Sequence, residues 1–172
     1  MDLLEPTVTW LLTEHDAQFV VLGTGDPRYH EMFERIQERY PDRARAFLKF
    51  DASLARRIYA SADMFLMPSV VEPCGLGQMI AMRYGSVPIV RRTGGLADTV
   101  TDHGAASGHG TGFVFVENTP EACQEALQRA LDVYEDRETW RALQMRGMES
   151  DFSWTASARE YVDLYRKALA VH

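Results

Sequence analysis

One carboxylate stands at an unusual place in this sequence. Glu72 follows an apolar run and is followed at once by the residues PCGLG. The glycines leave the backbone open, so the N–H groups of Gly75, Leu76 and Gly77 can bind an anion at the start of a helix expected over residues 76–84. A carboxylate instead suits hydroxyl groups or a developing positive charge. The pattern therefore predicts a ligand with both parts, such as a nucleotide sugar, and the alternative is a solvated loop glutamate beside a helix cap.

A second glycine pair follows the next apolar run. Gly94 and Gly95 open the backbone before a short helix expected over residues 96–101. Arg91 and Arg92 precede them and can either compensate a phosphate or pair with carboxylates on the surface. Both alternatives remain open at the level of the sequence.

An earlier Gly-x-Gly stands in residues 23–27, GTGDP, directly after an apolar run. It can bring the backbone close to a phosphate or simply form a tight turn. Position 28 is arginine, so the dinucleotide-binding pattern G-x-G-x-x-G is not complete. This departure disfavours a nicotinamide oxidoreductase.

Four other side chains have types that can take part in binding or catalysis. Phe50 ends a predicted strand and can stack on a base or belong to the core. Cys74 stands at a helix start, where the pKa of a thiol can fall, but no base lies near it in sequence. His103 and His109 lie in the glycine-rich segment 103–112, which is expected to be mobile, and they lack the convergent partners of a metal site. We therefore predict no metal site at these histidines.

These residues are positioned by alternating strands and helices. Five apolar runs have the length of buried strands: residues 18–22, 45–50, 64–68, 87–91 and 112–116. Uninterrupted apolar strands are typical of a parallel sheet that is covered on both faces. The alternation predicts a doubly wound, Rossmann-like α/β fold, in which ligands bind beyond the carboxyl ends of the strands. Four loops should lie at that edge: residues 23–27, 50–53, 69–77 and 92–96.

The helical part of the chain shows clear start signals. Ser53, Thr119 and Ser153 are each predicted to cap a helix at its amino end. Beyond residue 118 only helical patterns remain, and Trp140 and Trp154 are expected to lie in the core. We predict one domain over residues 1–172, with strand and helix alternation over 1–117 and a helical part over 118–172.

Composition restricts the class of protein further. The chain has 172 residues, of which 46% are hydrophobic and 25% charged, and a net charge of −7. Such an acidic chain is not expected to bind nucleic acid in general, because phosphate binding needs an excess of Lys and Arg. Cys74 and Cys123 match no disulfide or metal spacing and suggest a reducing compartment such as the cytosol. No segment is long and apolar enough to suggest membrane insertion.

Several motifs occur in an order known from one family. VVLGTGDPRY, LARRIYASADMFLMPS, EPCGLGQMIAMRYGSVPIVRRTGGLADTV, TGFVF and DFSWTASAREYVDLYRKAL follow one another along the chain. In this order they resemble bacterial glycogen synthases and plant starch synthases. The resemblance implies the carboxyl-terminal domain of a GT-B glycosyltransferase, which transfers glucose from ADP-glucose or UDP-glucose to an α-1,4-glucan with retention and without a metal. It also implies a cytoplasmic protein, or a plastid protein if its source is a plant.

The resemblance also assigns roles to residues. Glu72 matches the active-site glutamate that contacts the donor glucose and stabilises an oxocarbenium-like state. The positions implied to bind the nucleotide sugar are Phe50, Cys74, Gly75, Leu76, Gly77, Gly94 and Gly95. Among them, Phe50 matches an aromatic residue that stacks on adenine.

The sequence departs from the family at several positions. Gly77 replaces the usual threonine, so only its backbone can contact the phosphate. Val70 and Val71 replace an arginine and a phenylalanine. Ile80 stands where related transferases carry a second glutamate, as it does in the glycogen synthases.

The resemblance further implies that the chain is a carboxyl-terminal fragment. Members of the family carry a strand and an R…QKG segment before the position of Asp2, and an amino-terminal domain that binds the glucan. We therefore expect the chain to be inactive alone. Strands 18–22 and 64–68 should each have an unpaired edge, to be closed by pairing with each other, by swapping with another copy, or by a partner strand. The alternative function is a non-catalytic nucleotide-sugar or interaction module.

Overall fold

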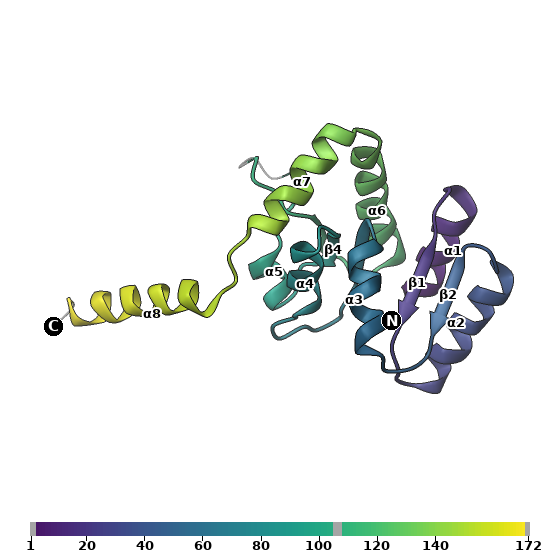
Figure 1. Cartoon of the computed structure of the whole chain (residues 1–172), viewed down its shortest axis with the longest axis horizontal. Coiled ribbons are helices and arrows are strands. Elements are labelled where there is room, and N and C mark those ends of the chain that lie inside the picture. The colour runs from purple at the N-terminus through teal and green to yellow at the C-terminus, as the bar shows by residue number, and fades with distance from the viewer. Residues whose placement is uncertain (1–2, 105–107, 171–172) are drawn as a thin grey trace.

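A computed structural model describes residues 3–104 and 108–170 and shows the predicted alternation of strands and helices (Figure 1). The described strands are Phe19–Leu22 (β1), Ala44–Phe47 (β2), Met64–Met67 (β3), Val87–Arg91 (β4) and Phe113–Phe115 (β5). Each begins within one residue of its predicted start. The second strand ends at Phe47, three residues earlier than expected, so Phe50 lies in the loop after it.

The described helices are Leu4–Glu14 (α1), Pro27–Arg39 (α2), Ala52–Ser61 (α3), Gly77–Arg83 (α4), Gly95–Thr99 (α5), Pro120–Glu135 (α6), Arg137–Glu149 (α7) and Trp154–Leu169 (α8). Thr119 caps α6 and Ser153 caps α8, as predicted. The predicted cap at Ser53 is wrong. Asp51 occupies that position, and its carboxylate accepts a hydrogen bond of 2.9 Å from the Leu54 N–H.

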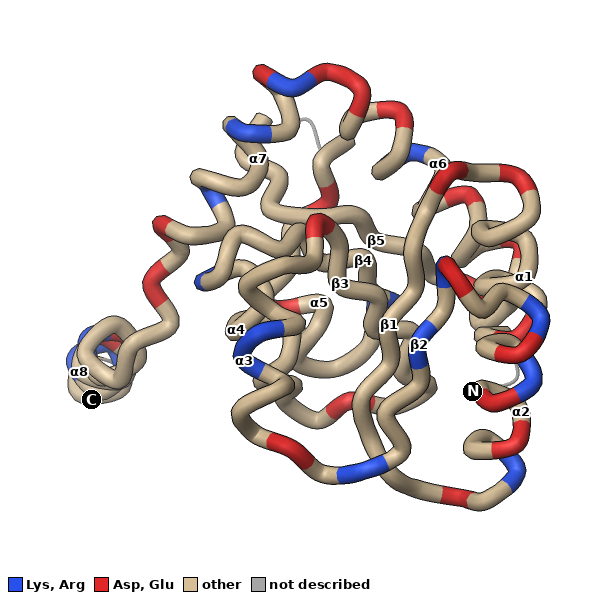
Figure 2. The backbone as a smooth tube through the Cα atoms, turned by 45° about the vertical axis from the view of Figure 1, so that its right-hand side comes forward, with Lys and Arg blue, Asp and Glu red and all other residues tan. Residues whose placement is uncertain are grey.

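All strand pairs are parallel, but they form two separate sheets. One sheet has the order β1–β2 and the other has the order β3–β4–β5. Figure 2 shows that strands β3 to β5 are largely free of charged residues, as a sheet covered on both faces requires. Among the described residues β1 and β3 share no ladder. The predicted alternative in which strands 18–22 and 64–68 pair directly with each other is therefore wrong.

Helices cover both faces of the three-stranded sheet. Along β4, Val87 and Ile89 pack in a core cluster with α6 and α7, whereas Val90 packs in another cluster with α4 and α5. This alternation follows from the period of two along a strand. It confirms the doubly wound arrangement and leaves the loops at the strand ends accessible.

A third core cluster belongs to the β1–β2 sheet. Val8 and Leu12 of α1 pack there against α2, whereas Leu3 and Trp10 at the same helix pack against the cluster of α6 and α7. The first helix therefore connects the two halves of the molecule. Leu66 of β3 is partly buried and contacts the clusters of both halves.

Helix α8 extends away from the rest of the molecule (Figure 1). None of its residues is buried. Trp154 at its start is 91% exposed, so the prediction that it lies in the core is wrong, whereas Trp140 of α7 is 3% exposed, as expected. Apolar spacing alone cannot tell whether a helix has a surface to pack on. Over residues 3–104 and 108–170 no helix is long and apolar enough to cross a membrane.

Candidate functional site

The predicted site lies where β3 and β4 end. The loop after β3 carries Glu72 and runs to α4, and the loop after β4 carries the second glycine pair and runs to α5. The Gly95 N–H donates a hydrogen bond of 3.1 Å to the carbonyl oxygen of Glu72. The two loops therefore form one structure at the edge where ligands of such folds bind.

Backbone contact between these loops explains the second glycine pair. A Cβ atom on Gly94 would lie 2.0 Å from the Glu72 carbonyl oxygen, and one on Gly95 would lie 2.0 Å from that of Cys74. Gly94 also has a φ of 45°, which favours glycine. The pair thus allows the loop of Glu72 to pack directly on the loop after β4, and the N–H of Gly95 is used in that contact.

Arg91 holds the same loop from the other side. Its Nε donates to the Ser69 carbonyl oxygen at 2.9 Å, and its Nη2 donates to the carbonyl oxygen of Val70. Its Nη1 donates to the Val116 carbonyl oxygen at 3.4 Å. Among the described residues Arg91 pairs with no carboxylate, because its guanidinium group donates to backbone carbonyl groups. Its role toward a phosphate stays a prediction. Arg92 is exposed.

The loop orients the Glu72 side chain, but no described cationic side chain pairs with its carboxylate. Its side chain is half-buried, and the Ser69 Oγ donates to its Oε2 at 3.3 Å. Within the described part of the chain it forms no ion pair, since the salt bridges found there involve other carboxylates. The carboxylate can therefore accept hydrogen bonds from hydroxyl groups of a ligand.

Gln78 is a site residue that the sequence reasoning missed. Its Nε2 lies 2.8 Å from the Gly75 carbonyl oxygen, 3.2 Å from that of Cys74 and 2.9 Å from Thr99 Oγ1. The side chain is fully buried. A polar residue in the first turn of a helix whose single charge, Arg83, lies at its end was the signal that could have revealed it. Gln78 fixes the turn at Gly75, whose φ is 73°.

The turn leaves backbone donors available. Among the described residues the N–H groups of Gly75, Leu76 and Gly77 have no hydrogen-bond acceptor outside helix α4, which starts at Gly77. A Cβ on Gly77 would lie 3.1 Å from the Phe65 ring. This contact explains why a small residue suits this position here. Cys74 is exposed, and its Sγ lies 3.8 Å from the Gly75 carbonyl oxygen, with no base beside it.

The first glycine motif connects β1 to α2, and the N–H groups of both glycines are in use. The Gly23 N–H donates to the Phe47 carbonyl oxygen and the Gly25 N–H donates to His30 Nε2, each at 3.1 Å. Asp26 then caps α2 and binds Arg28, whose hydrogen bonds lower the pKa of the Asp26 carboxyl to about 2. These contacts disfavour a phosphate-binding role for the N–H groups of Gly23 and Gly25.

Phe50 is not a core residue, because it is 88% exposed. It lies in the loop between β2 and α3. His103 packs against the Phe113 ring with the ring centres 5.5 Å apart. The three central residues of the predicted mobile segment, 105–107, lie outside the described residues. No group of three potential metal ligands occurs among the residues that are described.

Comparison with known proteins defines the class. The family model described as "Glycosyl transferases group 1" matches residues 4–143. A glycogen synthase of Thermotoga maritima is 52% identical over 171 residues, which is 99% of this chain and 35% of that protein. A glycogen synthase of Gloeobacter violaceus is 52% identical over 170 residues, or 98% and 37% of the two chains.

Solved structures agree with this result. The catalytic domain of starch synthase IV from Arabidopsis thaliana, bound to ADP and acarbose, aligns with a TM-score of 0.85 and 37% identity, over 98% of this chain and 36% of that one. A sucrose-phosphate synthase from Thermosynechococcus elongatus aligns with a TM-score of 0.69 and 26% identity, over 98% and 43%. The fold is that of the carboxyl-terminal domain of GT-B glycosyltransferases.

The chain belongs to the group 1 glycosyltransferase family. Within that family its matched relatives are glycogen synthases, and it resembles a solved starch synthase, as the sequence motifs predicted. The chain spans about a third of the length of the curated relatives it matches.

Proposed function

We propose that this chain is the donor-binding part of a glucosyltransferase of the glycogen and starch synthase type. The reaction transfers glucose from ADP-glucose or UDP-glucose to an α-1,4-glucan with retention, and needs neither a metal nor a further cofactor. The observation that carries the proposal is the oriented, unpaired carboxylate of Glu72 beside the free N–H groups of the Gly75 turn. Similarity to glycogen synthases over 99% of the chain supports it.

In this proposal each part of the site binds one part of the donor. Glu72 accepts hydrogen bonds from glucose hydroxyl groups and stabilises the positive charge that develops at the sugar. The backbone of Cys74, Gly75 and Leu76 contacts the glucose and the distal phosphate, and Gly77 contributes its N–H. Phe50, being exposed, stacks on the base.

Stabilisation of the negative charge on the leaving diphosphate is the part of the reaction that this chain supports least. Arg91 already donates to three backbone carbonyl groups. Departure of a diphosphate needs cationic or hydrogen-bond stabilisation. We therefore expect the chain to bind the donor but not to turn it over by itself. The glucan would be bound by a part of the enzyme outside these residues, in the cytoplasm or in a plastid.

Calorimetry with two ligands tests the role of Glu72. Glu72→Gln should weaken binding of ADP-glucose by about tenfold or more, because a hydrogen bond to a charged group is lost. Binding of ADP should change little, since Glu72 contacts only the sugar. Glu31→Gln, at an exposed position of α2, is the matched control. Equal affinity of both variants for ADP-glucose would contradict the assignment of Glu72.

A non-catalytic nucleotide-sugar module is the second candidate. The occupied guanidinium of Arg91 favours it, because this side chain already donates to the backbone of the Glu72 loop. Incubation of a longer protein that contains this chain with ADP-glucose and a maltooligosaccharide distinguishes the enzyme from the non-catalytic module. Chain elongation that Glu72→Gln reduces by about 100-fold would support the enzyme, whereas donor binding without elongation would support the module.

A further inference from the structure

A pair of polar side chains connects the two loops of the Glu72 site. Gln78 belongs to the first turn of α4, and Thr99 is the last residue of α5. The Gln78 Nε2 donates to Thr99 Oγ1 at 2.9 Å, and the Thr99 hydroxyl donates in turn to the Gly95 carbonyl oxygen at 2.6 Å. Hydrogen bonds therefore lead from α4 to the glycine pair that precedes α5.

These bonds close into a ring. At one end, the Gln78 Nε2 also donates to the Gly75 carbonyl oxygen at 2.8 Å. At the other end, the Gly95 N–H donates to the Glu72 carbonyl oxygen at 3.1 Å. Because Glu72 and Gly75 lie in the same loop, the hydrogen bonds and that loop form one closed set, here called the loop network. Its members are Glu72, Gly75, Gln78, Gly95 and Thr99.

The loop network stands on a packed core. Met82 of α4 and Leu96 of α5 are buried in the same cluster, so the two helices share one support. Above it the loops touch directly, since a Cβ on Gly95 would lie 2.0 Å from the Cys74 carbonyl oxygen. Close-packed segments keep their spacing. The loop network therefore joins two segments that have little freedom to slide past each other.

A contribution to stability alone does not explain Gln78 well. Its Oε1 is buried and has no partner among the described residues. A buried acceptor without a partner destabilises the folded state. Rotating the amide would bring Oε1 against the oxygens of Cys74, Gly75 and Thr99, which repel it. The position thus requires the donors of Gln78 even though its acceptor remains unused.

We propose that Gln78 and Thr99 are positioning residues that set the separation between the Glu72 carboxylate and the N–H groups of the Gly75 turn. This role rests on the proposed function, in which the carboxylate binds the sugar and the turn binds the distal phosphate. A ligand that reaches both groups has to match their separation. The gain in affinity that the sugar adds to a nucleoside diphosphate therefore depends on the loop network.

The two residues act at different points of the network. Gln78 holds the turn itself, whereas Thr99 connects that turn to Gly95 and so to the Glu72 loop. Without the Thr99 hydroxyl, the two hydrogen atoms of the Gln78 amide still have the carbonyl oxygens of Cys74 and Gly75 as acceptors. Loss of Thr99 should therefore affect the sugar, and loss of Gln78 should affect the phosphate as well.

Calorimetry on the full chain with ADP-glucose and ADP tests Thr99. Thr99→Val has nearly the same shape but lacks the hydroxyl, and should weaken binding of ADP-glucose by about tenfold while changing that of ADP by less than about twofold. Thr99→Ser keeps the hydroxyl and should bind both ligands within about twofold of the unmodified chain. A purely structural defect lowers the fraction of binding-competent protein and weakens both ligands by the same factor.

Gln78→Met tests the other half of the pair. Methionine has a similar length but no donor, so both ligands should bind at least about fivefold more weakly. In this variant, adding Glu72→Gln should cause less than about twofold further loss of ADP-glucose affinity, because the carboxylate is already misplaced.

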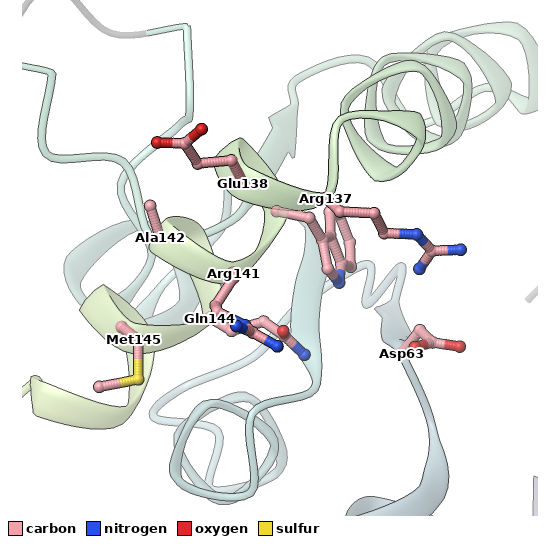
Figure 3. Close-up of a pocket in the computed structure, with 8 residues that line it drawn as sticks. Asp63, Arg137, Glu138, Arg141, Ala142, Gln144 and Met145 are labelled. Carbon is pink, nitrogen blue, oxygen red and sulfur yellow. The ribbon is translucent and has the colours of Figure 1, made fainter.

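A second glutamine provides the matched control for Gln78. Gln144 lines the pocket in Figure 3, and its Nε2 donates to the carbonyl oxygen of Gly85, beyond the other end of α4, at 2.7 Å. Gln144→Met should leave both affinities within about twofold. If Gln78→Met does not fold, the comparison of Thr99→Val with Thr99→Ser decides the result.

The outcomes separate this role from the proposed function. Equal losses of ADP and ADP-glucose affinity in Thr99→Val, or equal effects of the valine and serine variants, would overturn the positioning role alone. A full effect of Glu72→Gln in the Gln78→Met background would do the same. If Glu72→Gln has no effect in the unmodified chain, the proposed function fails, and the positioning role fails with it.

Discussion

At the scale of single residues, the geometry of the site depends on groups that do not face the ligand. Gly95 and Arg91 use their N–H donors on the backbone of the Glu72 loop, and Gln78 binds the turn that follows it. A carboxylate on an unsupported loop would sample many positions. These contacts are therefore the reason that Glu72 has a defined orientation.

Replacing Gly95 by alanine tests this backbone packing. The added Cβ would lie 2.0 Å from the Cys74 carbonyl oxygen, so the Glu72 loop has to move. We expect the free energy of unfolding in urea to fall by about 1–3 kcal/mol. Gly23→Ala is the control, since no atom lies within 4 Å of its added Cβ, and its effect should stay within about 0.5 kcal/mol. Equal stability of the two variants would disprove the packing argument.

The cap of α2 makes a testable contribution to acid stability. Hydrogen bonds from Arg28 lower the pKa of Asp26 to about 2 from an ordinary value of 3.8. Because the pKa of Asp26 is lower in the folded state, its ionised carboxylate stabilises the folded protein at pH values above the ordinary pKa. This stabilisation is lost as the pH falls from about 4 to about 2. The urea midpoint of the unmodified chain should therefore fall more steeply in this window than that of Asp26→Asn. Parallel curves for the two proteins would contradict the prediction.

At the scale of elements, α8 differs from every other helix of the carboxyl-terminal half. Helices α6 and α7 bury Leu127 and Leu143 against the sheet, but no residue of α8 is buried. Its exposed apolar residues are Trp154, Tyr161, Val162, Leu164, Tyr165 and Leu169. An isolated helix of this length is marginal in water, so α8 adds little to the stability of the rest.

Truncation of the chain tests whether α8 contributes to the stability of the rest of the molecule. Removal of residues 153–172 should change the midpoint of thermal unfolding by less than about 2 °C, because no core contact is lost. Removal of residues 137–172, which also deletes buried Trp140 and Leu143, should prevent cooperative unfolding. Circular dichroism measures the thermal unfolding of both truncated chains. A large loss of stability in the shorter truncation would show that α8 packs on the molecule.

At the scale of the whole molecule, the fold consists of two parallel sheets with separate clusters. Leu12 belongs to the cluster of β1 and β2, and Ile89 belongs to the cluster of β4 and β5. Among the described residues no ladder joins the sheets, and α1 contacts both clusters. Such an arrangement favours unfolding of one half at a time.

Core truncations in each half test this expectation. Leu12→Ala should destabilise its half by about 2–5 kcal/mol and speed hydrogen exchange in β1 and β2 while leaving β4 and β5 unchanged. Ile89→Ala should have the reverse effect. If both substitutions speed exchange equally in all five strands, the molecule unfolds as one unit.

Much of the architecture follows from local sequence patterns. The runs 64–68 and 87–91 were predicted as strands because buried parallel strands are uninterrupted apolar segments. Thr119 and Ser153 were predicted as caps because a hydroxyl group beside a helix start accepts a backbone N–H. Errors arose where two local signals competed, as at Asp51 and Ser53.

The sequence by itself determined the parallel α/β class, the family motifs and the candidate carboxylate at Glu72. Only the tertiary structure decided that Arg91 binds the loop of Ser69, that Gly95 packs on Cys74, and that the described strands β1 and β3 do not pair with each other. Periodicity and capping act between neighbours in the chain, so a single sequence shows them. Contacts between distant segments depend on which surfaces meet in the folded molecule, and no local pattern contains that information.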